Sequence, residues 1–253
     1  MPIHYIGVYH STRHHETGEK TRELDFLKPE LRALAQAGVK RIGFEGAWSK
    51  PVRELERKWL KQKPEAQYWA GATSFARRVL KLEVVPLIRT PAENAMNFFR
   101  WVIIQAHKQG VDSNEEWKKF VERAERNILS HPEASRDPTY LNTLPLLREV
   151  EKLVRSINNN FLFGLVHDLT CSVSMRMHEN AESDGLEHNV VGQYHALDLA
   201  SIHGPKVAAR LVGDKRFRPS QQELQQAYER VVRRRLVEPR ITRLWEVAEA
   251  TAK

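Results

Sequence analysis

The chain has 253 residues, of which 41% are hydrophobic and 28% are charged, a composition typical of a globular protein with a large core. The 40 Lys and Arg outnumber the 32 Asp and Glu, and this excess of +8 suggests an anionic partner without requiring one, since it is spread along the chain. Cys171 is the only cysteine, which excludes an intramolecular disulfide. With no basic-then-apolar leader and no apolar run long enough to span a bilayer, we expect a cytoplasmic protein without membrane contact.

The first predicted strand covers residues 3–9 and is followed by His10. Segment 11–20 has no large apolar side chain and is typical of a loop. It carries three side chains that could reach a site, namely His14, His15 and Glu16. For the two histidines a solvated, charged loop is the simpler interpretation.

A helix and a second strand come next. Leucines and an alanine recur at helical spacing over 24–35, and Gly38 is a plausible stop. Residues 39–45 are apolar enough for a strand that ends on Glu45. Strand, helix and strand make a βαβ unit with parallel strands, so His10 and Glu45 should lie at the same sheet edge.

The middle of the chain is predicted to be mainly helical, with one strand. Residues 51–63 and 72–80 have helical patterns, and residues 82–88 predict a third strand despite Pro86 inside it. From about 91 to 160 only helical patterns occur. We therefore expect a helical insertion at about 91–160.

Residues 161–182 predict a further helix or a broken pair of helices. Four side chains of this segment share one helical face, namely His167, Cys171, Ser174 and His178. Such a face could ligate a metal. Packing with satisfied hydrogen bonds is the commoner explanation.

A late apolar run echoes the first strand. Residues 190–195 end in Gly-Gln-Tyr-His, as residues 5–10 end in Gly-Val-Tyr-His. Each run indicates a buried strand that finishes on a histidine, His195 or His10. Two strands that end alike suggest neighbours in one sheet, with both imidazoles at the carboxyl edge where ligands bind in open α/β sheets.

The remaining chain is predicted to be helical. A helix over 196–211 should break near Gly204, and a basic helical tail covers about 219–250 with a break at Pro239. The tail carries a cationic patch of Arg230, Arg233, Arg234 and Arg235. The patch has no interleaved aromatic residues, so nucleic-acid binding is a possible but not favoured function.

These elements predict an α/β fold with a small, largely parallel sheet flanked by helices. The helical insertion and the helical C-terminal tail would belong to a single domain, residues 1–253. Motifs of other enzyme classes are missing: there is no Gly-x-Ser-x-Gly, phosphate-binding loop, His-Glu-x-x-His or dinucleotide fingerprint. The chain therefore does not look like a nucleophile-elbow hydrolase, a P-loop NTPase or a Rossmann oxidoreductase.

His10, Glu45 and His195 are the predicted site. Two imidazoles and one carboxylate suit a catalytic divalent metal ion such as Mn, Co or Zn, which activates bound water and polarises a carbonyl. A second carboxylate, Glu16 or Asp168, could serve as general base. Without a metal, the same groups could catalyse acid–base hydrolysis with Arg176 stabilising an oxyanion.

At these residues the chain resembles the superfamily of the TraB/PrgY proteins, the GumN-like and TIKI metalloproteases, the ChaN haem-binding proteins and the erythromycin esterases. Its hallmarks are two Gly-x-x-His motifs, matched by residues 7–10 and 192–195. A glutamate closing the second strand is matched by Glu45, and an arginine in the helix before the second motif by Arg176. The resemblance covers about residues 1–90 and 160–212. In the TraB branch an arginine shortly follows the glutamate, whereas here the next is Arg53.

The resemblance implies metal-dependent hydrolysis of a peptide or of a small-molecule ester, with His10, Glu45 and His195 as metal ligands or acid–base groups and Arg176 as the oxyanion partner. The same family also contains binding and signalling proteins. A non-catalytic protein that holds a metal, haem or a peptide is therefore the alternative, beside a basic nucleic-acid-binding protein. Fold-level likeness does not decide between these reactions.

Overall fold

The computed structural model describes residues 2–11, 13, 18–46, 64–132, 134–220, 222 and 238–252. The chain divides into two compact units. The first comprises Met1–Ile88 and Ser174–Val231, and the second comprises Arg89–Val173 and Val232–Lys253. The single-domain organisation stays a prediction, and each unit is described by itself.

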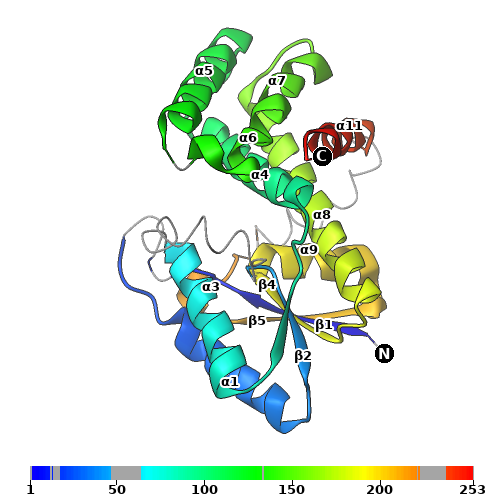
Figure 1. The fold of residues 1–253 in the computed structure, drawn as a ribbon. Helices are drawn as coiled ribbons and strands as arrows, with labels where there is room; N and C mark the ends of the chain where they lie inside the picture. Colours follow the sequence, from blue (N-terminus) through cyan, green and yellow to red (C-terminus); the bar gives the residue numbers. More distant parts are fainter. Residues whose placement is uncertain are drawn as a thin grey trace. The chain divides into compact units, whose positions relative to one another are not determined.

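A five-stranded parallel sheet organises the first unit (Figure 1). Its strands are β1 (Ile3–Val8), β2 (Arg41–Phe44), β3 (Glu83–Pro86), β4 (His188–Gly192) and β5 (Val207–Val212). The spatial order is β3-β2-β4-β1-β5. The predicted α/β class is confirmed. So is the predicted pairing of the two echoing strands, since Ile6 of β1 stands opposite Val190 of β4.

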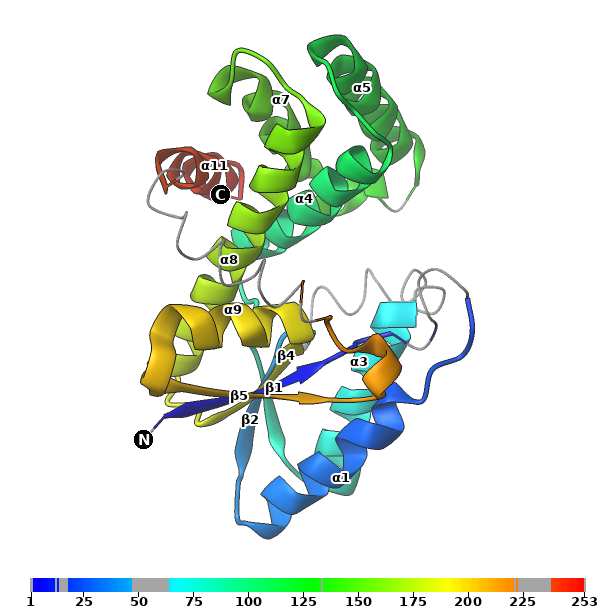
Figure 2. The same ribbon diagram turned by 180° about the vertical axis from the view of Figure 1, so that it is seen from behind.

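Helices cover both faces of this sheet. They are α1 (Glu23–Gln36), α3 (Pro64–Ser74), the residues of α8 (Asn159–Ser183) from Ser174 onward, and α9 (Gln193–His203). A π-helical turn, Phe75–Val79, follows α3. In Figure 2, α1 and α3 lie on one face of the sheet and α9 lies on the other.

The alternation of β1 explains why both faces are covered. Ile6 and Val8 belong to the hydrophobic cluster that also contains residues of α1 and α3. Tyr5 and Gly7 point to the opposite face, because Tyr5 hydrogen-bonds His178 of α8 and the missing Cβ of Gly7 would meet Ala196 of α9. Side chains of successive strand residues point to opposite faces, so one strand serves both layers.

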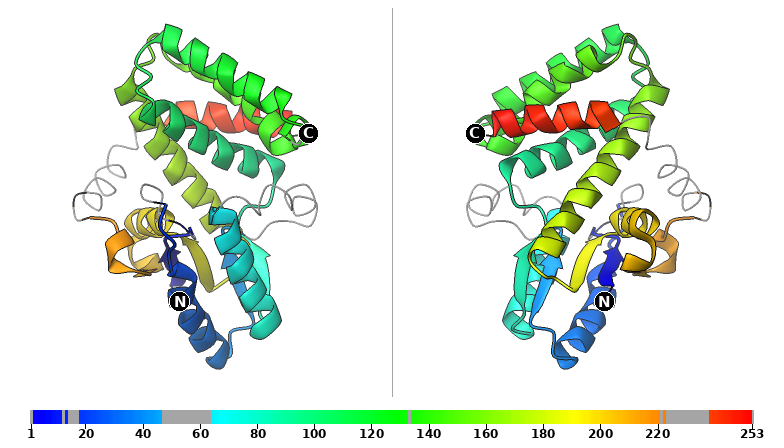
Figure 3. Two further views of the ribbon diagram at one scale, coloured as in Figure 1. Left: turned by 90° about the vertical axis from the view of Figure 1, so that its left-hand side faces the viewer. Right: turned by 90° about the vertical axis from the view of Figure 1, so that its right-hand side faces the viewer.

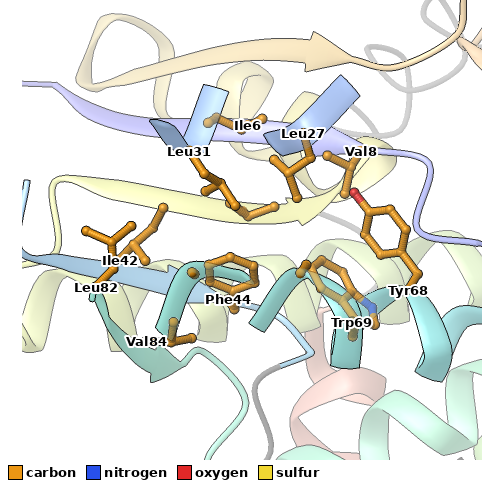
Figure 4. Packing of buried hydrophobic residues seen from close by; sticks show 13 residues of the cluster. Ile6, Val8, Leu27, Leu31, Ile42, Phe44, Tyr68, Trp69, Leu82 and Val84 are labelled. Atoms are coloured by element: carbon orange, nitrogen blue, oxygen red, sulfur yellow. The ribbon is translucent and has the colours of Figure 1, made fainter. Parts of the chain in front are cut away.

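Figure 4 shows the cluster between the sheet and the α1–α3 layer. Leu27 and Leu31 come from one stripe of α1, as the leucine spacing predicts. They pack with Phe44 of β2 and with Tyr68 and Trp69 of α3. Burying side chains of this size contributes about 1.5–3 kcal/mol each, which holds α1 and α3 against the sheet.

The connections leaving β1 and β4 run in opposite directions. The chain goes from β1 through α1 to β2, on one side, and from β4 through α9 to β5, on the other side. The two strands are neighbours, and the helices that follow them lie on opposite faces. The carboxyl ends of two such strands form a crevice where open α/β sheets bind their ligands.

Two predictions about this half of the chain are wrong. Residues 207–212 form strand β5, which pairs with β1, whereas the sequence indicated a helix over 196–211. The helix α9 ends at His203, and Gly204 follows with φ +54°, a left-handed conformation that favours glycine. In addition, β4 ends at Gly192, so His195 lies in the first turn of α9 and not at the end of a strand.

The described residues of the second unit form helices and short turns. The helices are α4 (Pro91–Lys108), α5 (Asn114–Ser130), α6 (Pro138–Leu141), α7 (Thr143–Leu153), α8 up to Val173, and α11 (Glu238–Thr251). Thr90 and Glu93 form a capping box at the start of α4. The helix α11 packs against α4 and α7 (Figure 3), with Arg243 paired to Glu149 at 2.9 Å. The helical nature predicted for about 91–160 is confirmed.

Three predicted features lie outside the described residues: the helix at 51–63, the loop residues His14, His15 and Glu16, and the arginine patch of the tail. In the part of the chain that the structure describes, no helix is both long and apolar enough to cross a membrane.

Candidate functional site

The structure brings the three residues of the predicted site together at the carboxyl edge of the sheet. His10 follows β1, Glu45 directly follows β2, and His195 follows β4 within the first turn of α9. The Nε2 atom of His195 lies 3.6 Å from Oε1 of Glu45. The side chains of His195 and Glu45 are buried, with exposed fractions of 2% and 6%.

Glu45 is held by the end of β4. The backbone N–H of Gly192 donates to Oε2 of Glu45 at 2.6 Å, and the backbone N–H of Glu45 donates to the carbonyl of Val190 at 3.0 Å. A carboxylate oxygen that accepts a short backbone N–H bond is held in place by that bond. Glu45 therefore stands in a fixed position with its second oxygen facing His195.

The two Gly-x-x-His motifs support each other. A Cβ on Gly192 would lie 2.9 Å from Nε2 of His10 and 3.3 Å from Oε2 of Glu45. A Cβ on Gly7 would lie 2.8 Å from Cβ of Ala196 in α9, the helix that carries His195. The glycine of the second motif thus makes room for His10, and the glycine of the first motif makes room for the helix that carries His195.

Trp69 positions His10. The two rings stack with their centroids 5.4 Å apart and their planes 27° apart. The indole also lies on Gly46, where a Cβ would clash with it. Among the described residues, Nδ1 of His10 is buried without a hydrogen-bond partner. The imidazole is therefore oriented by stacking, and its nitrogens are not committed to a protein group that the structure describes.

Ser174 positions His195. This serine lies in the middle of α8 and is fully buried, and its Oγ lies 2.6 Å from Nδ1 of His195. The imidazole therefore contacts Ser174 through one nitrogen and faces Glu45 through the other. The sequence placed Ser174 only on a helical face with three other residues, and its pairing with His195 was not predicted.

That helical face does not act as one site. Ser174 contacts His195, whereas His178 accepts or shares a hydrogen bond with Tyr5 at 2.9 Å. His167 and Cys171 belong to the second unit, as does Asp168, one of the two predicted general bases. The other, Glu16, is outside the described residues, so the identity of a second carboxylate stays a prediction.

Arg176 is half exposed and lies against its own helix. Its guanidinium is 3.2 Å from Oε2 of Glu179, one turn further along α8. An exposed pair of this kind contributes less than about 1 kcal/mol. The oxyanion role of Arg176 stays a prediction.

A second buried acid lies at the same edge of the sheet, and nothing in the sequence singled it out. Glu23 is 2% exposed at the start of α1, and its Oε1 accepts the backbone N–H of Asp214 at 3.1 Å. Its Oε2 has no hydrogen-bond partner in the described structure and fills the space of the missing side chain of Gly213. Tyr68 is fully buried, its hydroxyl has no hydrogen-bond partner among the described residues, and it is close enough to sense the charge of Glu23.

Burial raises the pKa of Glu23 to about 7. The N–H of Asp214 and the cations Arg216 and Arg218 oppose this rise, and the charge of Asp214 adds to it. For Tyr68, burial first and the charge of Glu23 second raise the pKa well above its ordinary value. Glu23 therefore exchanges a proton near neutral pH while Tyr68 stays protonated.

The donor types at the site fit a divalent metal ion, because imidazole and carboxylate are ligands of Zn, Co and Mn. The positions are less favourable. Within the described residues, no group of three or more His, Cys, Asp or Glu side chains is arranged to hold a metal ion. Binding of a metal ion by His10, Glu45 and His195 therefore stays a prediction.

Comparisons of the chain with protein-family models, curated proteins and solved structures found no match. The resemblance to the superfamily of TraB and TIKI proteins therefore rests on the motifs in the sequence. The geometry adds that the motif residues His10, Glu45 and His195 meet at one place in the fold.

Proposed function

We propose that this protein is a hydrolase of peptide or ester bonds whose site consists of His10, Glu45 and His195. The observation that carries the proposal is the convergence of these residues, which follow three different strands, at the carboxyl ends of β1, β2 and β4. The sheet order alone predicts ligand binding at this point. The contact of Glu45 with both Gly192 and His195 supports a preorganised acid–base pair.

In this proposal, Glu45 moves the proton and His195 positions it. Carboxylate Oε1 of Glu45 accepts a proton from the attacking water and later gives it to the leaving oxygen or nitrogen, while the imidazole of His195 orients this oxygen. Both groups are buried, so proton transfer takes place in a site of low dielectric constant where charge stabilisation is strong. His10, held between Trp69 and Gly192, binds the substrate or its attacking water from the other side.

In the metal-dependent form of the proposal, His10, Glu45 and His195 would instead hold a divalent ion such as Mn, Co or Zn. When bound, it would supply Lewis acidity and a water of lowered pKa. The unpartnered Nδ1 of His10 supports an additional ligand at this site. A metal ion that binds only the folded protein would stabilise it, so metal uptake would be measurable as a change in stability.

The test compares two double variants. His10→Ala/His195→Ala removes the site, and His4→Ala/His188→Ala removes a stacked histidine pair from the same two strands at the opposite edge, with ring centroids 5.1 Å apart. Metal content is measured by inductively coupled plasma mass spectrometry after incubation with Mn, Co and Zn. Turnover is measured with p-nitrophenyl acetate and a fluorogenic peptide mixture.

We expect the site variant to lose about 100-fold or more of any turnover, together with bound metal, and the control variant to keep both. Equal turnover in the wild type and the site variant would contradict the proposal. Haem is also added to the wild type to test the alternative of a non-catalytic binding protein, because a Soret band without turnover indicates a haem-binding protein.

A further inference from the structure

The imidazole of His195 has a different neighbour at each nitrogen. Nδ1 lies 2.6 Å from Oγ of Ser174, and Nε2 lies 3.6 Å from Oε1 of Glu45. A neutral imidazole carries its proton on only one nitrogen, so the two neighbours decide which one. The ring, at 2% exposed, exchanges this contact with bulk water only by local opening.

Glu45 favours a proton on Nε2. Its carboxylate already accepts the N–H of Gly192 and presents only acceptor oxygens to His195. An unprotonated Nε2 would place a lone pair opposite a carboxylate, which is repulsive. The metal-free protein is therefore more stable with Nε2–H directed at Glu45, and Nδ1 then needs a donor.

Ser174 is that donor. A hydroxyl can give its proton to one atom and accept from another, so Ser174 suits Nδ1 in either protonation state. The side chain is fully buried and its Oγ lies against Nδ1 of His195, so its role is to position the imidazole. It lies on α8, while His195 lies on α9, so the bond fixes the ring across two helices.

We propose that Ser174 is the positioning residue of the site, and that its hydroxyl donates to Nδ1 of His195 and so holds the Nε2–H tautomer toward Glu45. This inference rests on the proposed function, because it gives Ser174 a role in that site. The quantity that the experiment observes is which ring nitrogen of His195 carries the proton. A serine at this position makes His195 the hydrogen-bond donor of the pair and leaves Glu45 as the acceptor.

The same hydroxyl permits the opposite state. If a metal ion takes the lone pair of Nε2, the proton must move to Nδ1, and Ser174 then accepts it. Histidines that bind metals commonly donate their second ring N–H to a neighbouring acceptor. Ser174 therefore allows His195 to change from a proton donor to a metal ligand without a ring flip.

The experiment is a long-range ¹H–¹⁵N correlation spectrum of histidine-labelled full-length protein, freed of metal with a chelator. The His195→Gln variant identifies the signals. Ser174→Ala removes the donor, and Ser174→Cys keeps the side-chain volume while offering only a weak S–H donor. Ser201→Ala is the matched control, because Ser201 is an exposed serine of α9 whose hydroxyl donates to the carbonyl of Leu197.

In the wild type we expect Nε2 to carry the proton and Nδ1 to show the ¹⁵N shift of a hydrogen-bonded acceptor. Ser174→Ala and Ser174→Cys should both move Nδ1 to the shift of an unbonded acceptor. Ser201→Ala should leave the spectrum unchanged.

An Nδ1–H tautomer in the metal-free wild type would overturn the inference. A ¹⁵N shift of Nδ1 in Ser174→Cys that equals the wild-type shift would also overturn it, because packing would then be the only role of the serine.

Zinc is then added to test the proposed function separately. Transfer of the proton to Nδ1 supports a metal at Nε2. An unchanged spectrum with zinc contradicts the metal part of the proposed function and leaves the role of Ser174 as measured without metal.

Discussion

Replacing the buried Glu23 by glutamine should change how the stability of the first unit depends on pH. In the folded protein the pKa of Glu23 is about 7, because the carboxyl is buried, compared with an ordinary value of 4.5. A raised pKa means that the folded state binds the proton more tightly. The stability that this provides is complete below pH 4.5 and is lost as the pH rises through 7.

The magnitude follows from the difference between the two pKa values. At about 1.4 kcal/mol for each tenfold change in proton affinity, the full effect is about 3 kcal/mol. Between pH 5 and pH 8 the wild type should lose about 2.5 kcal/mol through this group. Glutamine has nearly the same shape and does not titrate, so Glu23→Gln should lack this loss.

The assay is urea unfolding of both proteins at pH 5 and pH 8, with hydrogen exchange of the β1 and α1 amides as a readout local to the first unit. The quantity of interest is the difference in unfolding free energy between variant and wild type, because pH effects of all other groups cancel in it. Glu83→Gln, at a side chain that is 63% exposed, controls for the loss of one carboxylate.

We expect the difference to move by about 2.5 kcal/mol in favour of Glu23→Gln from pH 5 to pH 8, and the Glu83 control to change little. A difference that stays constant to within about 0.5 kcal/mol would refute the reasoning. It would mean that the carboxyl of Glu23 is ionised in the folded protein throughout, with its charge compensated by its neighbours.

Three further substitutions probe the site and the helical unit. Gly192→Ala places a Cβ 2.9 Å from Nε2 of His10 and 3.3 Å from Oε2 of Glu45, so we expect loss of turnover and metal with a cost in stability of about 1–3 kcal/mol, measured by thermal unfolding and the metal assay. Trp69→Ala should destabilise the first unit by about 3–5 kcal/mol, and Trp69→Phe by less, in urea titrations. Thr90→Ala removes the cap of α4 and should cost about 1 kcal/mol, readable as faster exchange of the first α4 amides. A wild-type result for any of the three would contradict the contact on which it depends.

Local patterns were sufficient for most of the first unit's elements. The leucine stripe and Gly38 define α1, and Gly38 has φ +90°, as a helix stop requires. Short apolar runs predicted β1, β2 and β3 near their observed bounds, because buried parallel strands are almost continuously hydrophobic. The echo of two Gly-x-x-His motifs predicted that β1 and β4 are neighbours.

Where local pattern and tertiary pairing disagree, the pairing decides. Residues 207–212, Val-Ala-Ala-Arg-Leu-Val, satisfy helix propensity about as well as strand propensity. They form β5 because the free edge of β1 accepts six of them in parallel register. Similarly, α9 starts at Gln193 and Ala196 in its first turn packs onto Gly7. His195 is therefore a helical residue.

The sequence by itself determined the fold class and three residues that meet at the site, because chemical type and strand ends are local properties. Only the tertiary structure decided what orients these residues. Ser174 is 21 positions from His195, and Glu23 is 191 positions from the Asp214 amide that it binds. A buried polar side chain is stabilised by partners from distant parts of the chain. Nothing local distinguishes such a serine or glutamate from one that faces water.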